Sequence, residues 1–81
     1  MIGANIIINI PHQNKVINLD NENITKLVEH AKSKLGQNSR VLLRYSGTEP
    51  VIRLMIEGEN ETMVTNTAKE IIATIENLLK D

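Results

Sequence analysis

Cysteine, phenylalanine and tryptophan are absent from this chain of 81 residues, and Tyr45 is its only tyrosine. Without cysteine the chain has no disulfide and no thiolate metal site, which fits a reducing compartment. The formal net charge of −1 provides no overall field that would gather nucleic acid or an anionic membrane. The apolar run NIIINI is far too short to span a bilayer and lacks the basic flank of a signal peptide. We therefore expect a soluble, cytoplasmic chain with an aliphatic core.

The length suits a single domain, residues 1–81, whose core is only just large enough to be stable alone. Near the N-terminus, apolar residues alternate in a pattern that predicts a half-buried strand ended by Pro11. Its repeating apolar positions are Ile6, Ile8 and Ile10. The following segment, residues 12–20, is either a loop or a short extra strand around residues 16–17.

Helical spacing of apolar residues predicts two helices. The first begins at an N-cap, either Asp20 or Asn21, and ends at Gly36. The second begins at the cap residue Asn60 and is long. The apolar stripe of the first is Ile24, Leu27, Val28, Ala31 and Leu35. That of the second is Val64, Ala68, Ile71, Ile72, Ile75, Leu78 and Leu79.

Two further strands, VLLRY and VIRLMIE, are joined by the turn SGTEP at hairpin length. The predicted order is therefore β-α-β-β-α. Two amphipathic helices and a small antiparallel sheet indicate the α+β class, with both helices packed on one face of the sheet.

The stretch RYSGTEPVIR, residues 44–53, contains the most informative side chains. Strand parity places Arg53 on the face opposite Ile52, so Arg53 points away from the core. Arg44 ends the incoming strand, and the two arginines flank one loop where their forks can bind one anion. An ordinary hairpin turn with solvated arginines remains the simpler alternative. The chain contains no G-x-x-x-x-G-K-[ST] motif, so nucleotide binding of that kind is unsupported.

Within this turn, Gly47 allows backbone dihedrals, or a close approach to a ligand, that a side chain would forbid. Successive backbone N–H groups in such a turn can form an anion-binding nest. The hydroxyls of Ser46 and Thr48 add two donors. These residue types in this order favour a bound phosphate.

The stretch RVLLRYSGTEPVIRLMIEGEN closely resembles the C-terminal domain of the α-D-phosphohexomutases, which has a TBP-like fold. The signature there is Arg-x-Ser-Gly-Thr-Glu-Pro followed shortly by a second arginine. These enzymes interconvert 1- and 6-phosphorylated sugars in carbohydrate metabolism. The continuation VIRLMIEGE looks most like the bacterial phosphoglucosamine mutase branch, which converts glucosamine 6-phosphate to glucosamine 1-phosphate. The phosphomannomutase and phosphoglucomutase branches share much of the signature and remain alternatives.

The resemblance implies roles for individual residues of this turn. The family's phosphate-binding loop, which grips the phosphate that is not transferred, is matched by Arg44, Ser46, Gly47 and Thr48. Arg53 matches the arginine that completes this clamp. Glu49 belongs to the motif as a supporting residue that orients an arginine or the backbone, because its carboxylate would repel phosphate. Tyr45 stands where many members have proline, and we expect that exchange to cost the loop some stiffness.

The resemblance also implies which parts of the catalytic apparatus lie elsewhere. In the family, a phosphoserine in the first domain donates the phosphoryl group, a Mg²⁺ site lies in the second domain, and the third selects the sugar. No matching serine loop or Asp-Gly-Asp segment occurs in this chain. We therefore expect no catalytic residue, metal site or cofactor in this chain, and an isomerase (an intramolecular phosphotransferase) as the parent protein. Its partners would be a phosphosugar and the parent's other domains, with no nucleic acid and no membrane.

Two other function classes fit the predicted elements. A free-standing phosphate- or RNA-binding module is possible, although the chain lacks a G-x-x-G clamp, aromatic stacking platforms and net positive charge. An interaction module would use the bare face of the sheet that carries Ile7, Val51 and Met55. The histidines, His12 and His30, lack ligand-spaced partners, and we expect both to be exposed.

Overall fold

The computed structural model describes residues 3–12 and 15–80. Its elements are β1 (Ala4–Pro11), α1 (Glu22–Leu35), β2 (Arg40–Tyr45), β3 (Val51–Gly58) and α2 (Glu61–Leu79), so the predicted order is confirmed. Two residues of the ambiguous segment, Gln13 and Asn14, lie outside the described residues. Residues 15–20 of that segment contain no strand, and Val16 is 84% exposed, which favours the loop alternative.

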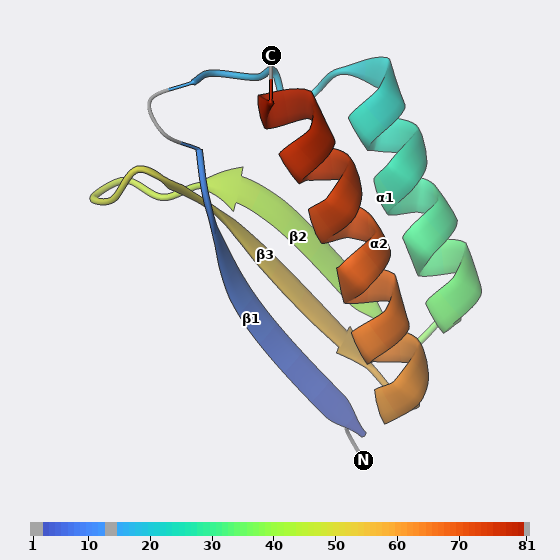
Figure 1. The fold of residues 1–81 in the computed structure, drawn as a ribbon. Coiled ribbons are helices and arrows are strands. Elements are labelled where there is room, and N and C mark those ends of the chain that lie inside the picture. Colours follow the sequence, from blue (N-terminus) through green and yellow to red (C-terminus); the bar gives the residue numbers. More distant parts are fainter. Residues whose placement is uncertain (1–2, 13–14, 81) are drawn as a thin grey trace.

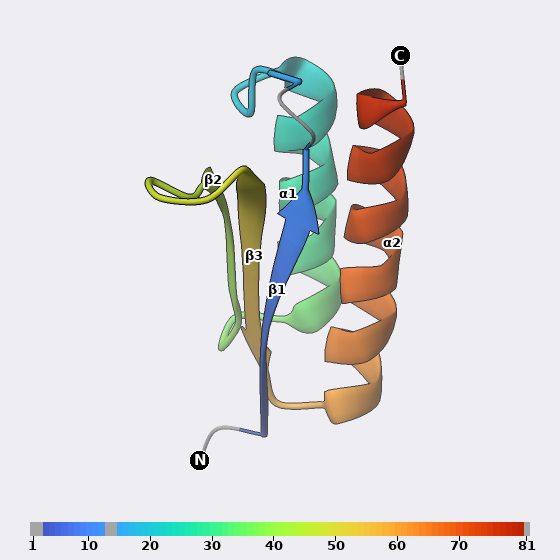
Figure 2. The same cartoon turned by 60° about the vertical axis from the view of Figure 1, so that its left-hand side comes forward.

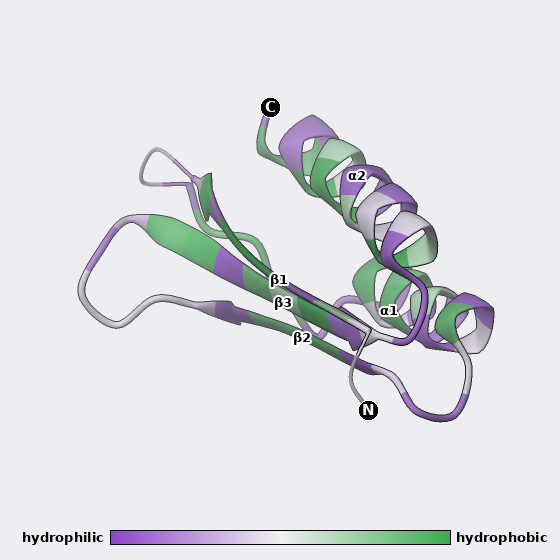
Figure 3. Ribbon diagram, turned by 90° about the horizontal axis from the view of Figure 1, so that it is seen from below, coloured by the Kyte–Doolittle hydropathy of each residue, from purple (hydrophilic) through white to green (hydrophobic). Residues whose placement is uncertain are grey.

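The three strands form one antiparallel sheet in the order β1-β3-β2, so the last strand along the chain is the central one. Both helices cover the same face of this sheet, and the loop between β2 and β3 extends beyond its end (Figures 1 and 2). Figure 3 shows the two layers from below, with no described element over the opposite face of the sheet. The predicted α+β class is confirmed.

Side chains and backbone geometry at the helix ends explain where the helices start and stop. Of the two candidate caps for α1, the structure selects Asn21, whose Oδ1 accepts a hydrogen bond of 2.7 Å from the Asn23 N–H. Gly36 ends α1 with a φ of 95°, and its N–H donates to the Lys32 carbonyl at 3.0 Å. The Asn60 Oδ1 caps α2 by accepting from the Met63 N–H at 3.0 Å.

Pro11 lies inside β1, as its last residue, and pairs with Val51 in the register. It can do so because β1 is an edge strand, where the missing N–H of proline leaves no neighbouring strand unpaired. The strand ends at the predicted residue, and the end of β1 lies beside Val51, where the chain leaves the candidate turn.

The core lies between the sheet and the helices and is almost entirely aliphatic. Ile52, Leu54 and Ile56 of β3 are 0% exposed, which confirms the predicted inner face of that strand. In α2, Thr67 is buried among the predicted stripe residues because it lies three residues after Val64, whereas Leu78 in the last turn is 38% exposed. Leu78 is therefore an exposed member of the predicted stripe, and Thr67 is a buried residue that this stripe of apolar residues did not include.

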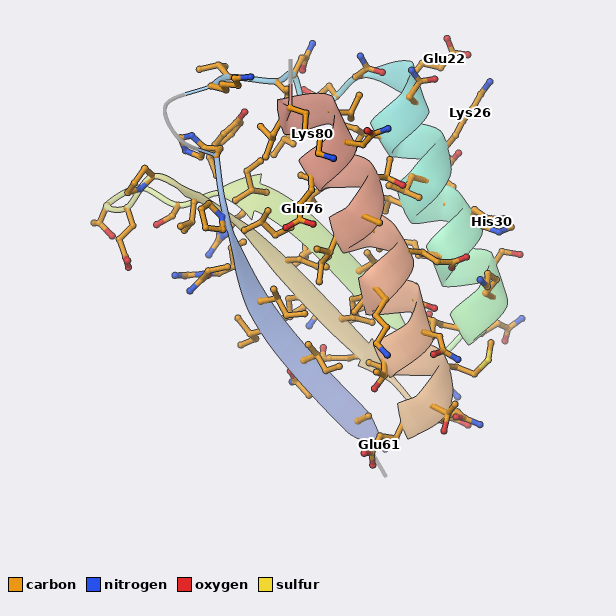
Figure 4. The ribbon with its side chains drawn as sticks, in the orientation of Figure 1. Glu22, Lys26, His30, Glu61, Glu76 and Lys80 are labelled. Atoms are coloured by element: carbon orange, nitrogen blue, oxygen red, sulfur yellow. The ribbon has the colours of Figure 1, made fainter. Side chains whose placement is uncertain are left out.

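The outward surfaces of the helices carry charged residues, and two of these residues join the helices. Figure 4 shows Lys26 and His30 pointing outward from α1, and Lys26 lies 3.1 Å from the Glu22 carboxylate. Lys34 donates a 2.6 Å hydrogen bond to Glu70 of α2, and this contact lowers the pKa of Glu70 below its ordinary value. Across residues 3–12 and 15–80, no helix has the length and apolar character needed to cross a membrane.

Candidate functional site

The open face of the sheet presents its side chains in rows, because each residue of the central strand has a partner on either side. One row places Arg53 of β3 between Asn9 of β1 and Arg44 of β2. The next row away from the loop is apolar and consists of Ile7, Met55 and Leu42. The row beyond it consists of Asn5, Glu57 and Arg40. Of the rows that carry a charge, the row with the two arginines is therefore the closest to the loop.

Arg44 and Arg53 are direct cross-strand partners, so two like charges stand side by side on one face. Such a pair destabilises a sheet by a few tenths of a kcal/mol, up to about 1 kcal/mol. Arg53 is half-buried and Arg44 is exposed. Within the residues that the structure describes, neither guanidinium forms an ion pair with a carboxylate. The parity prediction that Arg53 points away from the core is confirmed, and the row is a concentrated positive site.

Asn9 contributes a contact to this row that the sequence did not reveal. Its Oδ1 accepts a hydrogen bond of 3.3 Å from the Arg53 Nε. The terminal nitrogens of Arg53 are the ones that bind planar oxyanions in pairs, and this contact leaves them free of Asn9. The alternation of β1 assigns Asn9 to the open face, but only the pairing of β1 with β3 places it beside Arg53.

The loop between the two arginines, residues 46–50, is folded tightly on its own backbone. The Ser46 N–H donates to the Val51 carbonyl at 2.9 Å, and the Val51 N–H donates to the Glu49 carbonyl at 2.8 Å. The Ser46 Oγ accepts from two backbone N–H groups, those of Thr48 at 3.4 Å and Glu49 at 3.3 Å. These two bonds are long, and an anionic oxygen is a stronger acceptor than a hydroxyl. The loop therefore holds two N–H groups aimed at a common point.

Gly47 lies in this loop without the left-handed backbone that its sequence position suggested. Among the described glycines only Gly36 has a positive φ, so the turn itself does not require glycine at position 47. A Cβ atom added to Gly47 would meet nothing within 4 Å, which leaves open space above the loop. A close approach of a ligand remains the predicted reason for glycine here.

Glu49 enters the described contacts of the loop through its backbone. Its N–H donates to Ser46 and its carbonyl accepts from Val51. The predicted role of its carboxylate in orienting an arginine stays a prediction.

Tyr45 and His12 hold the loop from the inner side of the sheet, a feature that the sequence did not reveal. The Tyr45 hydroxyl donates to the Ile17 carbonyl and accepts from the Ile17 N–H, both at 2.7 Å. The His12 N–H donates to the Pro50 carbonyl at 3.1 Å, and the two rings meet edge to face with centroids 5.2 Å apart. His30 is exposed as predicted, but the prediction was wrong for His12, which is half-buried because it packs against Tyr45.

The described residues contain no cluster of side chains that could bind a metal ion. Across residues 3–12 and 15–80, no three side chains of the His, Cys, Asp or Glu type come together as a possible metal site. The chemistry that the site offers is therefore charge and hydrogen-bond donation to an anion, from two guanidinium groups, loop N–H groups and two hydroxyls.

Comparison with known proteins places these features in context. Residues 7–74 match the family described as "Phosphoglucomutase/phosphomannomutase, C-terminal domain". The chain is 40% identical over 74 residues to a phosphoglucosamine mutase of Cellvibrio japonicus, which covers 91% of this chain and 17% of that protein. It is 42% identical over 71 residues to one of Idiomarina loihiensis and 41% identical to one of Coxiella burnetii, each covering 88% of this chain. The chain spans only 16–17% of the length of these curated relatives.

Proposed function

This chain belongs to the phosphoglucomutase/phosphomannomutase C-terminal domain family, and we propose that it binds the phosphate group of a phosphosugar. The binding residues are Arg44, Ser46, Gly47, Thr48 and Arg53, with Glu49 in support. We call these five residues the anion clamp. They lie at one end of the sheet, on strands β2 and β3 and on the loop that joins them.

The observation that carries this proposal is the direct pairing of Arg44 with Arg53. Two adjacent guanidinium groups on an open sheet face repel one another, and a bound dianion turns that repulsion into attraction to a common partner. The loop beside them adds backbone N–H groups that now contact only the Ser46 hydroxyl at long distance. A phosphate offers enough acceptor oxygens to satisfy both groups of donors at once.

The proposed clamp combines two charged arginine side chains with uncharged donors of the loop. The arginines supply planar, charged donors that match phosphate oxygens in pairs. The hydroxyls of Ser46 and Thr48 and the loop N–H groups supply short-range donors, and Gly47 keeps the approach open. The proposal gives every group in this set a binding role and none the role of nucleophile or phosphoryl donor. On its own the chain is expected to bind and not to catalyse.

In a longer parent protein, this clamp would orient the sugar by gripping the phosphate that is not transferred. The binding energy of that remote phosphate fixes the position of the reacting end, first in one orientation of the sugar and then in the other. A phosphoserine and Mg²⁺ in the parent's other domains are expected to supply the phosphoryl group and neutralise its charge.

Glucosamine 6-phosphate is the proposed sugar, and its conversion to glucosamine 1-phosphate in the cytoplasm is the proposed reaction of the parent. This choice rests on the relatives named above, which are phosphoglucosamine mutases. The family description covers phosphoglucomutases and phosphomannomutases, so glucose and mannose phosphates are the alternative substrates.

The test is an amide NMR titration of this chain with inorganic phosphate and, separately, with glucosamine 6-phosphate. We expect weak binding with a Kd of about 1 mM, or about −4 kcal/mol, because one domain supplies only part of a site. Shifts should centre on residues 46–48 and on Arg53, and should be similar for both ligands.

Sodium chloride at matched ionic strength is the control, because screening alone also shifts the amides of charged surfaces. If phosphate shifts no loop amide beyond the chloride control at concentrations far above 1 mM, on the order of tenfold, the loop is an ordinary hairpin turn. The proposal is then wrong for this chain.

A further inference from the structure

Tyr45 separates two members of the proposed clamp, Arg44 and Ser46, and its side chain leaves the sheet on the other face. Arg44 points to the open face, whereas the ring of Tyr45 packs beside the core on the helix side. Its hydroxyl makes both a donated and an accepted hydrogen bond with the backbone of Ile17, each 2.7 Å long. This contact ties the end of β2 to the segment before α1, 28 residues earlier in the chain.

A second contact reaches the far side of the loop from the same layer. The His12 N–H donates to the Pro50 carbonyl at 3.1 Å, one residue past the last ladder pair of β1 with β3. The His12 ring meets the Tyr45 ring edge to face, at an interplanar angle of 79°. Loop residues 46–50 are therefore held at one end through Tyr45 and at the other through His12. None of these contacts uses a donor that faces the open side of the sheet.

We infer that Tyr45 is a positioning residue for the anion clamp, and that its hydroxyl couples phosphate binding to the segment around Ile17. The inference rests on the proposed function. Arg44 and Ser46 are the immediate neighbours of Tyr45. Because the hydroxyl of Tyr45 holds the backbone at position 45, it also sets the directions in which the side chains of Arg44 and Ser46 point. Tyr45 was expected to cost the loop stiffness relative to proline. Its hydroxyl restores an anchor by a long-range link, where proline acts by restricting its own dihedral angle.

The coupling has a measurable size. If the link to Ile17 opens, the loop samples arrangements in which the donors no longer converge. The apparent Kd is then the intrinsic Kd divided by the fraction of chains that are competent to bind. Removing the hydroxyl breaks both bonds to Ile17, and a net loss of about 1 kcal/mol changes such an equilibrium by about fivefold. Phosphate binding at residues 46–48 should also shift the Ile17 amide, which lies on the helix side and has no direct contact with a ligand over the open face.

The experiment compares the parent chain with Tyr45→Phe, which removes one oxygen and keeps the ring against His12. Ser39→Ala is the matched control, because the Ser39 Oγ also bonds a backbone group, donating to the Gly36 carbonyl at 2.6 Å, and lies at the opposite end of β2 from the clamp. Each protein is titrated with inorganic phosphate by amide NMR, and its unfolding free energy is measured with denaturant. A merely structural role of the Tyr45 hydroxyl would change the unfolding free energy and leave the phosphate Kd unchanged.

We expect Tyr45→Phe to weaken phosphate binding by about threefold to fivefold while the variant stays folded. The Ile17 shift should disappear in this variant, and Ser39→Ala should bind as the parent does. If Tyr45→Phe binds with the parent's Kd, the positioning role is wrong and the clamp proposal stands. If the parent chain itself shows no phosphate shifts beyond chloride, the clamp proposal fails, and that result is read from the parent alone.

Discussion

Replacing Arg53 with glutamine should move the stability and the phosphate affinity of this chain in opposite directions. Arg53 faces Arg44 directly across the sheet, so Arg53→Gln removes a like-charge pair. The relief is worth about 0.5 kcal/mol, in the middle of the range for cross-strand pairs. The variant loses the hydrogen bond to Asn9, which is long at 3.3 Å and lies on the open face of the sheet, so its loss offsets only part of this gain. Without ligand, the variant should be as stable as the parent or slightly more stable.

Phosphate affinity should fall sharply in the same variant. A guanidinium donates charge-assisted hydrogen bonds worth about 1.5–3 kcal/mol to a bound anion, so the Kd should rise by a factor of about 10 to 100. At tenfold excess over its Kd, phosphate stabilises the parent by about 1.4 kcal/mol, which raises Tm by roughly 6–11 °C for a domain of this size. At the same phosphate concentration, Arg53→Gln should keep about 0.4 kcal/mol of this stabilisation or less, so it loses at least about two thirds of the rise in Tm.

Arg40→Gln is the matched control, since Arg40 lies on the same face at the other end of β2. The Arg40 Nη1 lies 3.8 Å from the Glu57 carboxylate, so this variant loses an attractive pair worth up to about 1 kcal/mol. It makes the same change in net charge and should retain the phosphate-dependent rise in Tm. The assay is thermal unfolding by circular dichroism, with phosphate or with chloride at equal ionic strength.

Two results would refute this reasoning. If Arg53→Gln is clearly less stable than the parent without phosphate, the arginine pair is not a source of repulsion. If Arg53→Gln and Arg40→Gln lose the phosphate-dependent rise in Tm equally, phosphate binding depends on the net charge of the chain and not on a specific site at Arg53.

Three further changes test separate parts of the structure. Gly47→Ala should leave the unfolding free energy within about 0.5 kcal/mol of the parent, since its Cβ meets nothing, but should weaken phosphate binding in the NMR titration. Asn21→Ala removes the cap of α1 and should cost about 1 kcal/mol in denaturant unfolding without changing the phosphate Kd; a changed Kd would contradict the separation of the two regions. The Lys34 contact lowers the pKa of Glu70, so its stabilisation is present above the ordinary carboxyl pKa and is lost as pH falls through the lowered pKa. Lys34→Met should therefore flatten the acid side of the stability–pH curve, and an unchanged curve would show that the pair does not act in solution.

Much of the fold could be predicted from local patterns in the sequence. A strand with period two exposes alternate residues to opposite faces whatever it pairs with, so the burial of Ile52 and the outward direction of Arg53 follow from spacing. The caps Asn21 and Asn60 and the stop at Gly36 also act within a few residues of themselves. The SGTEP signature was recognisable for the same reason, because its residues are contiguous.

The predictions failed where a position depends on contacts outside its own segment. Periodicity includes Leu78 in the apolar stripe of α2, but burial there depends on what the last turn packs against. His12 reads as a solvated residue in a polar segment, and the ring of Tyr45 makes it half-buried. Local patterns carry no information on such neighbours.

Local sequence patterns were enough to predict the elements, the faces of the strands and the loop for which we propose anion binding. Only the tertiary structure decided that β3 lies in the centre, which brings Asn9 and Arg44 to either side of Arg53. The same holds for the link from Tyr45 to Ile17, because a hydrogen bond between distant segments exists only after the sheet and helices have packed. Local periodicity sets direction within a segment, whereas the pairing of segments is decided by the free energy of the whole core.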